Sequence, residues 1–487
     1  MFGKNASSVL WNFFNVLGQT FSGIVVGVIL ARLLSPSDFG IITLAMIFVG
    51  FSEYVAAFGV SSSIVQKKDL NEKHIKAANT VAFFMAMFLF LTFFFAAEYI
   101  SLFFEEDVLQ KIIIVMSVGL FFSAIASVPR GYLMRSMKFK LIAKVDLICG
   151  VVFRGGVSIA LAYSDYGVWS MVIGNVLAMI ISSVWLYFSS EISHKFSTSF
   201  CDIKDILKYS TSVSIKNSIN FASSNSDNLV IGKFFDAATL GLYSRAYQLA
   251  ALPMQKIAVS ISSVMFAVYS DVQDDKNKLK SEYLKTLSSV SILSIPILTG
   301  VFIASDYLII GLYGESWSGA SWVLKILCVA AAMDNILHLA GAVVQATDNV
   351  YKEVKNQIVY LLILVPGCLI AAQYNIYAVA AAHTVASLWL YISMGSLAIS
   401  IVGATWSEYL LAQRSGFIMS ALTGVFGYCL VGYFDQLQGY SYEYKLFLII
   451  VFFGLFYCVS IAIIPFDDFK KLRGVVYGRL RRKMNIS

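Results

Sequence analysis

Residues 31–41 of the chain read ARLLSPSDFGI, and residues 232–242 read GKFFDAATLGL. The two segments share one order of residue classes without a gap, at an offset of 201 residues. That order is a small residue, a basic residue, two apolar residues, four linker residues, an apolar residue, a glycine and an apolar residue. Each copy joins two long apolar stretches, and its glycine permits a tight turn between them. The segment therefore predicts an internal repeat.

The apolar stretches around the repeat indicate which solvent surrounds the chain. Of 487 residues, 58% are hydrophobic and only 13% are charged, whereas a soluble domain carries about 25% charged residues. The apolar residues come in blocks of about 20, which is the length that crosses a bilayer as a helix. They lack the short alternating segments of a β-barrel. We therefore expect an all-α polytopic membrane protein.

About fourteen transmembrane helices are predicted from these blocks. They cover residues 10–30, 41–62, 77–97, 112–133, 142–162, 166–188, 207–231, 240–268, 286–304, 319–343, 356–373, 376–401, 416–434 and 445–465. The copies of the repeat follow the first and seventh spans, and an even number of spans between them gives both halves the same orientation. The predicted domains are an N-terminal six-helix lobe (1–200), a C-terminal six-helix lobe (201–405), and a segment of two additional helices with a basic tail (406–487).

The distribution of basic residues predicts the orientation of the spans. Lysine and arginine gather in alternate loops, and one such loop holds Arg130, Arg135, Lys138, Lys140 and Lys144. The opposite loops are nearly free of them. Because cytoplasmic loops carry the excess of basic residues, both termini are predicted to be cytoplasmic (N-in, C-in). The basic tail fits a topology signal and contact with anionic lipids, although a site for a specific partner stays open.

Polar and basic residues inside the spans define a candidate substrate path. Several recur at steps of three and four, which places them on one face of a helix. They are Asn12, Asn15 and Gln19 in the first span, Lys216 and Asn220 in the seventh, Arg245 and Gln248 in the eighth, and Arg154 in the fifth. Because a basic residue is costly to insert in a bilayer, these cations favour a hydrated cavity for an anionic head group, with amides for sugar hydroxyls. The alternative is hydrogen bonding between helices.

Four acidic residues inside spans have two possible roles. They are Glu53, Asp146, Asp227 and Asp334. They could carry coupling ions, or they could neutralise nearby cations, which is the commoner fate of a buried charge. His338 and His383 lie on small apolar faces, where a structural role is favoured over a proton relay.

Several kinds of chemistry have no signature in the sequence. There is no G-x-x-x-x-G-K-[ST] loop for ATP, no H-E-x-x-H, and no Cys/His spacing typical of a metal site. We therefore predict no catalytic residues, no metal and no cofactor.

The chain resembles the Wzx-type polysaccharide flippases, which belong to the multidrug/oligosaccharidyl-lipid/polysaccharide (MOP) exporter superfamily. The resemblance rests on residues 7–12 (SSVLWN), Gly18-Gln19 and residues 29–40 (ILARLLSPSDFG). Residues 129–135 (PRGYLMR), 227–233 (DNLVIGK) and 240–247 (LGLYSRAY) are similar to the colanic-acid exporter branch.

This resemblance implies two six-helix lobes around an inward cavity lined by basic residues, in the bacterial inner membrane. It implies a substrate of the undecaprenyl-diphosphate-linked oligosaccharide class, moved to the outer leaflet for exopolysaccharide, capsule or O-antigen assembly. Coupling to an ion gradient is expected. The expected partners are membrane lipids and a polysaccharide polymerase or chain-length regulator, with no nucleic acid, and the chain is expected to act as a monomer. The alternatives are a membrane-embedded glycan polymerase or ligase, which would need larger outer loops, and a multidrug antiporter of the same superfamily.

Overall fold

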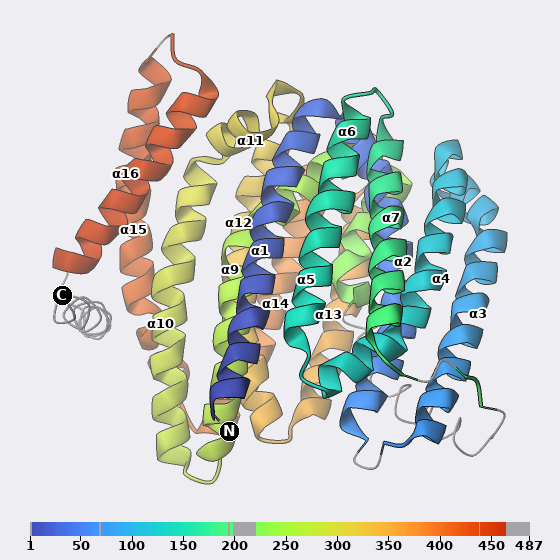
Figure 1. The fold of residues 1–487 in the computed structure, drawn as a ribbon. Coiled ribbons are helices and arrows are strands. Elements are labelled where there is room, and N and C mark those ends of the chain that lie inside the picture. The colour runs from blue at the N-terminus through green and yellow to red at the C-terminus, as the bar shows by residue number, and fades with distance from the viewer. Residues whose placement is uncertain (1, 68–69, 193–194, 198–220, 438, 464–487) are drawn as a thin grey trace, which may run out of the picture. The chain divides into compact units, whose positions relative to one another are not determined.

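The computed structural model describes residues 2–67, 70–192, 195–197, 221–437 and 439–463. All regular elements in this part of the chain are helical (Figure 1). The first group is α1 (Phe2–Leu33), α2 (Pro36–Gln66), α3 (Glu72–Phe104), α4 (Asp107–Arg135), α5 (Phe139–Ile148), the π-helical η1 (Cys149–Val157), α6 (Ser158–Ala162) and α7 (Val168–Ser189). Residues 221–234 are also helical.

The remaining elements continue the all-helical pattern. They are α9 (Ala237–Asp271), α10 (Lys276–Ile303), α11 (Ser305–Tyr313), the 3₁₀ turn η2 (Glu315–Trp317), α12 (Ala320–Ala346), α13 (Val350–Ala371), α14 (Ile376–Val402), α15 (Trp406–Gln436) and α16 (Tyr442–Ile463).

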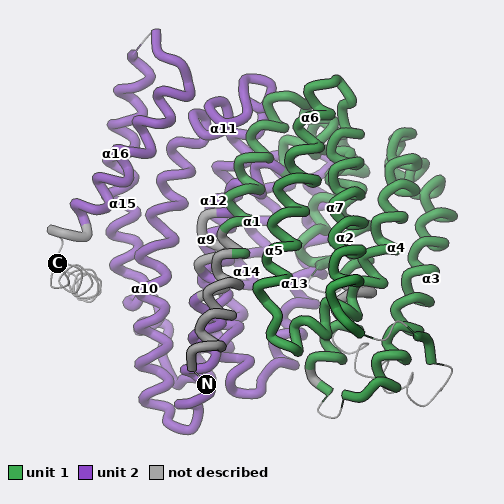
Figure 2. The backbone as a smooth tube through the Cα atoms, in the orientation of Figure 1, with its two compact units in different colours: residues 1–244 green, residues 245–487 purple. Residues whose placement is uncertain are grey.

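The chain divides into two compact units, Met1–Ser244 (unit 1) and Arg245–Ser487 (unit 2) (Figure 2). In unit 1, α4 packs against α2, α3 and α7, and α1 packs against α5 and η1. In unit 2, α10 packs against α15 and α12, while α14 packs against α12 and α13. The predicted domain boundaries at residues 200 and 405 follow from the repeat and the order of the spans, not from compactness. They therefore stay a prediction.

The repeated segment forms a helix–turn–helix in both copies. In the first copy, Ser35 caps α2 through a capping box with Asp38, and Pro36 occupies the first turn. This arrangement satisfies amide groups that the start of a helix leaves without partners. In the second copy, Asp236 accepts a hydrogen bond of 3.0 Å from the backbone N–H of Thr239 at the start of α9.

The two copies contact each other within unit 1. A Cβ atom added to Gly40 would overlap the carbonyl oxygen of Ala237, and one added to Gly241 would overlap that of Pro36. These two contacts are equivalent under the offset of 201 residues. Thr43 Oγ1 also lies 3.3 Å from Ser244 Oγ, and these residues are themselves 201 positions apart. The glycines of the repeat therefore permit a close backbone crossing of the equivalent helices.

The predicted all-α membrane fold is confirmed. Eleven helices in the described part of the chain are long and apolar enough to cross a membrane, and α1 contributes a shorter apolar stretch, Gly18–Leu33. The seventh predicted span lies mostly outside the described residues, so the count of fourteen and the orientation stay predictions. The structure adds two short elements that hydropathy does not reveal, α11 and η2.

Candidate functional site

A cavity of about 570 Å³, lined by both polar and apolar side chains, lies in unit 1 and is called the unit 1 cavity below. Helices α1, α2, α4, α5 and α7 contribute to its wall. Its polar lining consists of Asn15, Glu53, Ser61, Ser62, Ser123, Ser127, Arg130, Asp146, Ser182 and Ser183. Three residues predicted as functional from their position in spans, Asn15, Glu53 and Asp146, are therefore brought together in one cavity.

A bidentate ion pair joins α4 to α5 in this cavity. Arg130 Nη1 donates to Asp146 Oδ1 at 3.0 Å, and Nη2 donates to Oδ2 at 2.6 Å. The Asp146 side chain is only 13% exposed, whereas that of Arg130 is 41% exposed. Two parallel charge-assisted hydrogen bonds fix the guanidinium against the carboxylate. Of its two predicted roles, Asp146 therefore takes up charge pairing in this structure. Arg130, which the sequence pattern placed in a cytoplasmic loop, lies in α4 and lines the cavity.

The second carboxylate of the cavity faces cationic groups as well. Glu53 on α2 interacts with Arg154, with the hydroxyl of Ser123 and with Arg130. Arg154 comes from η1, where the i→i+5 hydrogen-bond pattern interrupts the α-helix that begins as α5 and ends as α6. Such single π-helical segments in a helix are frequent at functional sites. Arg154 is exposed in the protein and is not among the lining residues of the cavity.

The predicted polar face of the first span is partly described. Gln19 Nε2 donates to Asn15 Oδ1 at 2.9 Å, one helical turn away. Asn15 is buried and lines the unit 1 cavity, whereas Gln19 is exposed. The side chain of Asn12, and all of Lys216 and Asn220, lie outside the described residues.

Asp227 is held in the interior of unit 1. Its side chain accepts a hydrogen bond of 2.6 Å from the hydroxyl of Tyr243 and another of 2.8 Å from the backbone N–H of Asn228. Both Asp227 and Tyr243 are fully buried. Asp227 is not among the residues that line the unit 1 cavity.

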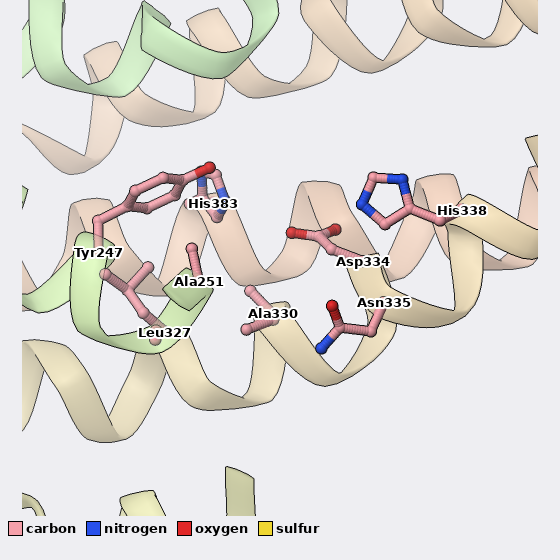
Figure 3. A pocket seen from close by; sticks show the side chains of 10 residues that line it. Tyr247, Ala251, Leu327, Ala330, Asp334, Asn335, His338 and His383 are labelled. Atoms are coloured by element: carbon pink, nitrogen blue, oxygen red, sulfur yellow. The ribbon is translucent and has the colours of Figure 1, made fainter. Parts of the chain in front are cut away.

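Unit 2 contains a small pocket of about 50 Å³, called the unit 2 pocket below. Asp334 and Asn335 on α12 line it together with His338, with His383 on α14 and with Tyr247 on α9. Asp334 lies between His383 and His338 (Figure 3) and interacts with the His383 ring and the Ser387 hydroxyl. The pocket has room for a water molecule or a small ion, but not for a sugar.

The two remaining predicted residues also lie in unit 2. Arg245 Nη1 donates to Gln248 Oε1 at 2.6 Å, three residues along α9. The guanidinium interacts with the hydroxyl of Tyr313, the last residue of α11, as well. Neither Arg245 nor Gln248 lines the unit 2 pocket.

Comparison with known proteins settles the family. The family model described as "Polysaccharide biosynthesis protein" matches residues 29–322. The chain belongs to the polysaccharide biosynthesis protein family.

Two relatives named for polysaccharide biosynthesis align with this chain over much of their length. The lipopolysaccharide biosynthesis protein WzxC of Escherichia coli K12 is 22% identical over 443 residues, which cover 88% of this chain and 87% of WzxC. The succinoglycan biosynthesis transport protein ExoT of Rhizobium meliloti is 23% identical over 330 residues, covering 66% of this chain and 65% of ExoT. Their names describe polysaccharide biosynthesis and transport, which is consistent with the prediction that the chain is not an enzyme.

Solved structures of membrane transporters share the fold of this family member. The lipid II flippase MurJ, in an inward closed conformation, matches with a TM-score of 0.77 over 97% of this chain and 99% of MurJ, at 16% identity. An inward-facing multidrug transporter of the MATE family matches with a TM-score of 0.60 over 79% of this chain and 95% of that one, at 17% identity. The predicted membership of the Wzx-type flippases is confirmed, and the chain is a multi-pass protein of the bacterial inner membrane.

Sequence reasoning missed most of the polar wall of the unit 1 cavity in this family member. Six serines face it, two each from α2, α4 and α7. A signal was present, because Ser123 and Ser127 are one helical turn apart, and Ser61-Ser62 and Ser182-Ser183 are adjacent pairs. The signal is weak, since serine in a membrane helix commonly bonds to its own backbone.

Proposed function

We propose that this chain moves undecaprenyl-diphosphate-linked oligosaccharide repeat units from the inner to the outer leaflet of the cytoplasmic membrane. The repeat units would then serve exopolysaccharide, capsule or O-antigen assembly. The proposed cycle is alternating access, in which the cations Arg154, Lys216 and Arg245 contribute to binding the anionic part of the substrate.

The observation that supports this proposal most directly is the unit 1 cavity. It is large enough for a sugar and carries polar groups inside a helical membrane protein. The unit 1 cavity measures about 570 Å³ and carries an ion pair, an amide and six hydroxyl groups. Polar groups inside a bilayer are costly and usually mark a substrate or ion path. Relatives named for polysaccharide biosynthesis, together with the fold shared with a lipid II flippase, support lipid-linked glycans as the substrate class.

Coupling to an ion gradient is assigned to Asp334, which lines the unit 2 pocket beside His383. Glu53 lines the unit 1 cavity, where it faces Arg154, and is assigned to charge pairing. Asp146 is bound to Arg130, and Asp227 to Tyr243, so these two serve to pair and hold neighbouring helices.

The proposal is tested in a strain that lacks the gene, by measuring which leaflet holds the lipid-linked oligosaccharide. We expect accumulation in the inner leaflet, reversed by the intact chain but not by Arg245→Ala or Lys216→Ala. Membrane levels of each variant are measured in parallel to exclude loss of protein. Normal delivery to the outer leaflet without the chain would overturn the flippase assignment.

The same strain separates the alternatives. If the chain were a glycan polymerase, its loss would leave single repeat units at the surface, whereas loss of a flippase leaves none. The shared fold with a MATE family transporter makes a multidrug antiporter the other alternative. An antiporter would change resistance to cationic drugs and leave surface glycans intact.

A further inference from the structure

The wall of the unit 1 cavity is rich in hydroxyl groups that come from three separate helices. These residues are Ser61 and Ser62 on α2, Ser123 and Ser127 on α4, and Ser182 and Ser183 on α7. Serine can both donate and accept a hydrogen bond. A wall of this kind matches a ligand whose surface consists of hydroxyl groups, which also donate and accept.

Some of these hydroxyls have protein partners, and one does not. Ser61 Oγ donates to the carbonyl oxygen of Ser127 at 2.6 Å, which ties α2 to α4. Ser182 Oγ donates to the carbonyl oxygen of Met179 at 3.1 Å. Ser127 Oγ is different: its residue is 2% exposed, and within the described part of the chain this hydroxyl has no hydrogen-bond partner. This hydroxyl also has almost no surface that a water molecule in the cavity could reach, so in this structure it does not present a hydrogen-bonding group to a ligand there.

The charges around this cavity balance. Arg130 is neutralised by Asp146 in the bidentate pair, and Glu53 faces Arg154. A diphosphate needs unpaired cations, because charge-assisted bonds from guanidinium or ammonium groups supply most of its binding. The described residues at this cavity leave no excess of positive charge to supply those bonds. An uncharged sugar can bind without such an excess.

We propose that the unit 1 cavity binds the saccharide part of the lipid-linked substrate rather than its diphosphate, and that Ser61 and Ser62 help to select the sugar. The inference rests on the proposed function and deepens it. The diphosphate is then bound by cations outside this cavity. Sugars with free hydroxyls and no charge are the favoured class.

The test measures the affinity of purified protein in lipid nanodiscs for two probes. One probe is undecaprenyl diphosphate, and the other is the same lipid carrying one N-acetylglucosamine. We expect the wild-type chain to bind the glycosylated probe more tightly. Ser61→Ala and Ser62→Ala should each weaken that binding roughly three- to tenfold, the value of one hydrogen bond, and should change the affinity for the sugar-free lipid less than about twofold.

Two buried serines outside the cavity provide matched controls. Ser117 lies on α4 and donates to the carbonyl of Ile114, and Ser52 lies on α2 and donates to that of Phe48. Ser117→Ala and Ser52→Ala should leave the affinities for both probes unchanged, which separates sugar recognition from a general effect of losing a buried hydroxyl.

Three results would overturn the inference. Equal affinity of the wild type for both probes would remove the sugar from this cavity and leave the flippase proposal intact. Equal weakening of both probes in the Ser62→Ala variant would assign the cavity to the diphosphate. No binding of either lipid would contradict the proposed function itself, and the inference with it.

Discussion

The unit 1 cavity and the unit 2 pocket differ in size and in the state of their charges. The first measures about 570 Å³, and two of its charged side chains, Arg130 and Asp146, form an ion pair. The second measures about 50 Å³ and places a carboxylate beside two histidines. The difference indicates that room for a sugar and groups that can bind a small ion are found in separate units of the chain. Under the proposed function, glycan recognition and ion coupling are therefore expected to be separable by mutation.

The largest expected effect follows from breaking the ion pair of the unit 1 cavity. Arg130→Met would leave Asp146, 13% exposed, with an uncompensated charge, so we expect a loss of about 1–3 kcal/mol in the free energy of unfolding. Because Arg130 is partly exposed, the loss stays below that of a fully buried pair. The measurement is thermal unfolding in detergent.

The double variant Arg130→Met with Asp146→Leu serves as the control, because it removes both charges at once. It should recover most of the lost stability. A single variant that unfolds like the wild type would show that the pair does not hold α4 against α5.

The next effect concerns ion coupling. Asp334→Asn should reduce the acceleration of transport by an imposed ion gradient roughly tenfold, a coupling free energy of about 1.4 kcal/mol. Affinity for the glycosylated probe should not change. Transport is measured in proteoliposomes with and without the gradient, separately for protons and for sodium. An unchanged response to both gradients would remove Asp334 from the coupling mechanism.

Variants that place a larger side chain in each cavity test whether sugar binding and ion coupling are separable. Ser62→Phe should lower the affinity for the glycosylated probe roughly fivefold, because it occupies space that the sugar needs. Ala330 is buried and lines the unit 2 pocket, so Ala330→Leu should alter gradient dependence and spare sugar binding. If either variant produced both defects, the two sites would not be separable.

The smallest effect is expected outside both cavities, at the end of α3. Lys233 Nζ donates to Glu105 at 2.8 Å, and this hydrogen bond, with the charge of Lys233, lowers the pKa of the Glu105 carboxyl. A lowered pKa in the folded state stabilises the protein above the unfolded pKa, and this contribution is lost as the pH falls through the folded pKa. Because the Glu105 side chain is 80% exposed, Lys233→Met should change the unfolding temperature little at neutral pH, and the difference should vanish in acid. Transport should be unaffected, and a transport defect would assign this pair a role in the cycle.

The fold was largely predictable, because its causes are local in the sequence. Long apolar blocks predict the helices, and residues 31–41 predict the turn that recurs at residues 232–242. The close crossing at Gly40 and Gly241 was not predicted. It depends on which backbone the glycine faces, and periodicity carries no information about that.

The candidate site was only partly predictable. Asn15, Glu53 and Asp146 were singled out because polar residues in spans are costly, and they meet in one cavity. Arg130 was counted with a loop because it lies near a helix end. The contact of Asp334 with His383 joins residues from different helices, so no local pattern reveals it.

The most direct test of the flippase assignment is reconstitution of the purified chain alone into liposomes with a fluorescent undecaprenyl-diphosphate-linked oligosaccharide. A quencher added outside reports the fraction of probe in the outer leaflet. The account predicts that the chain accelerates movement of the probe between leaflets, and that Arg245→Ala slows it at equal protein levels. A rate equal to that of protein-free liposomes, with the chain folded and an ion gradient imposed, would contradict the account.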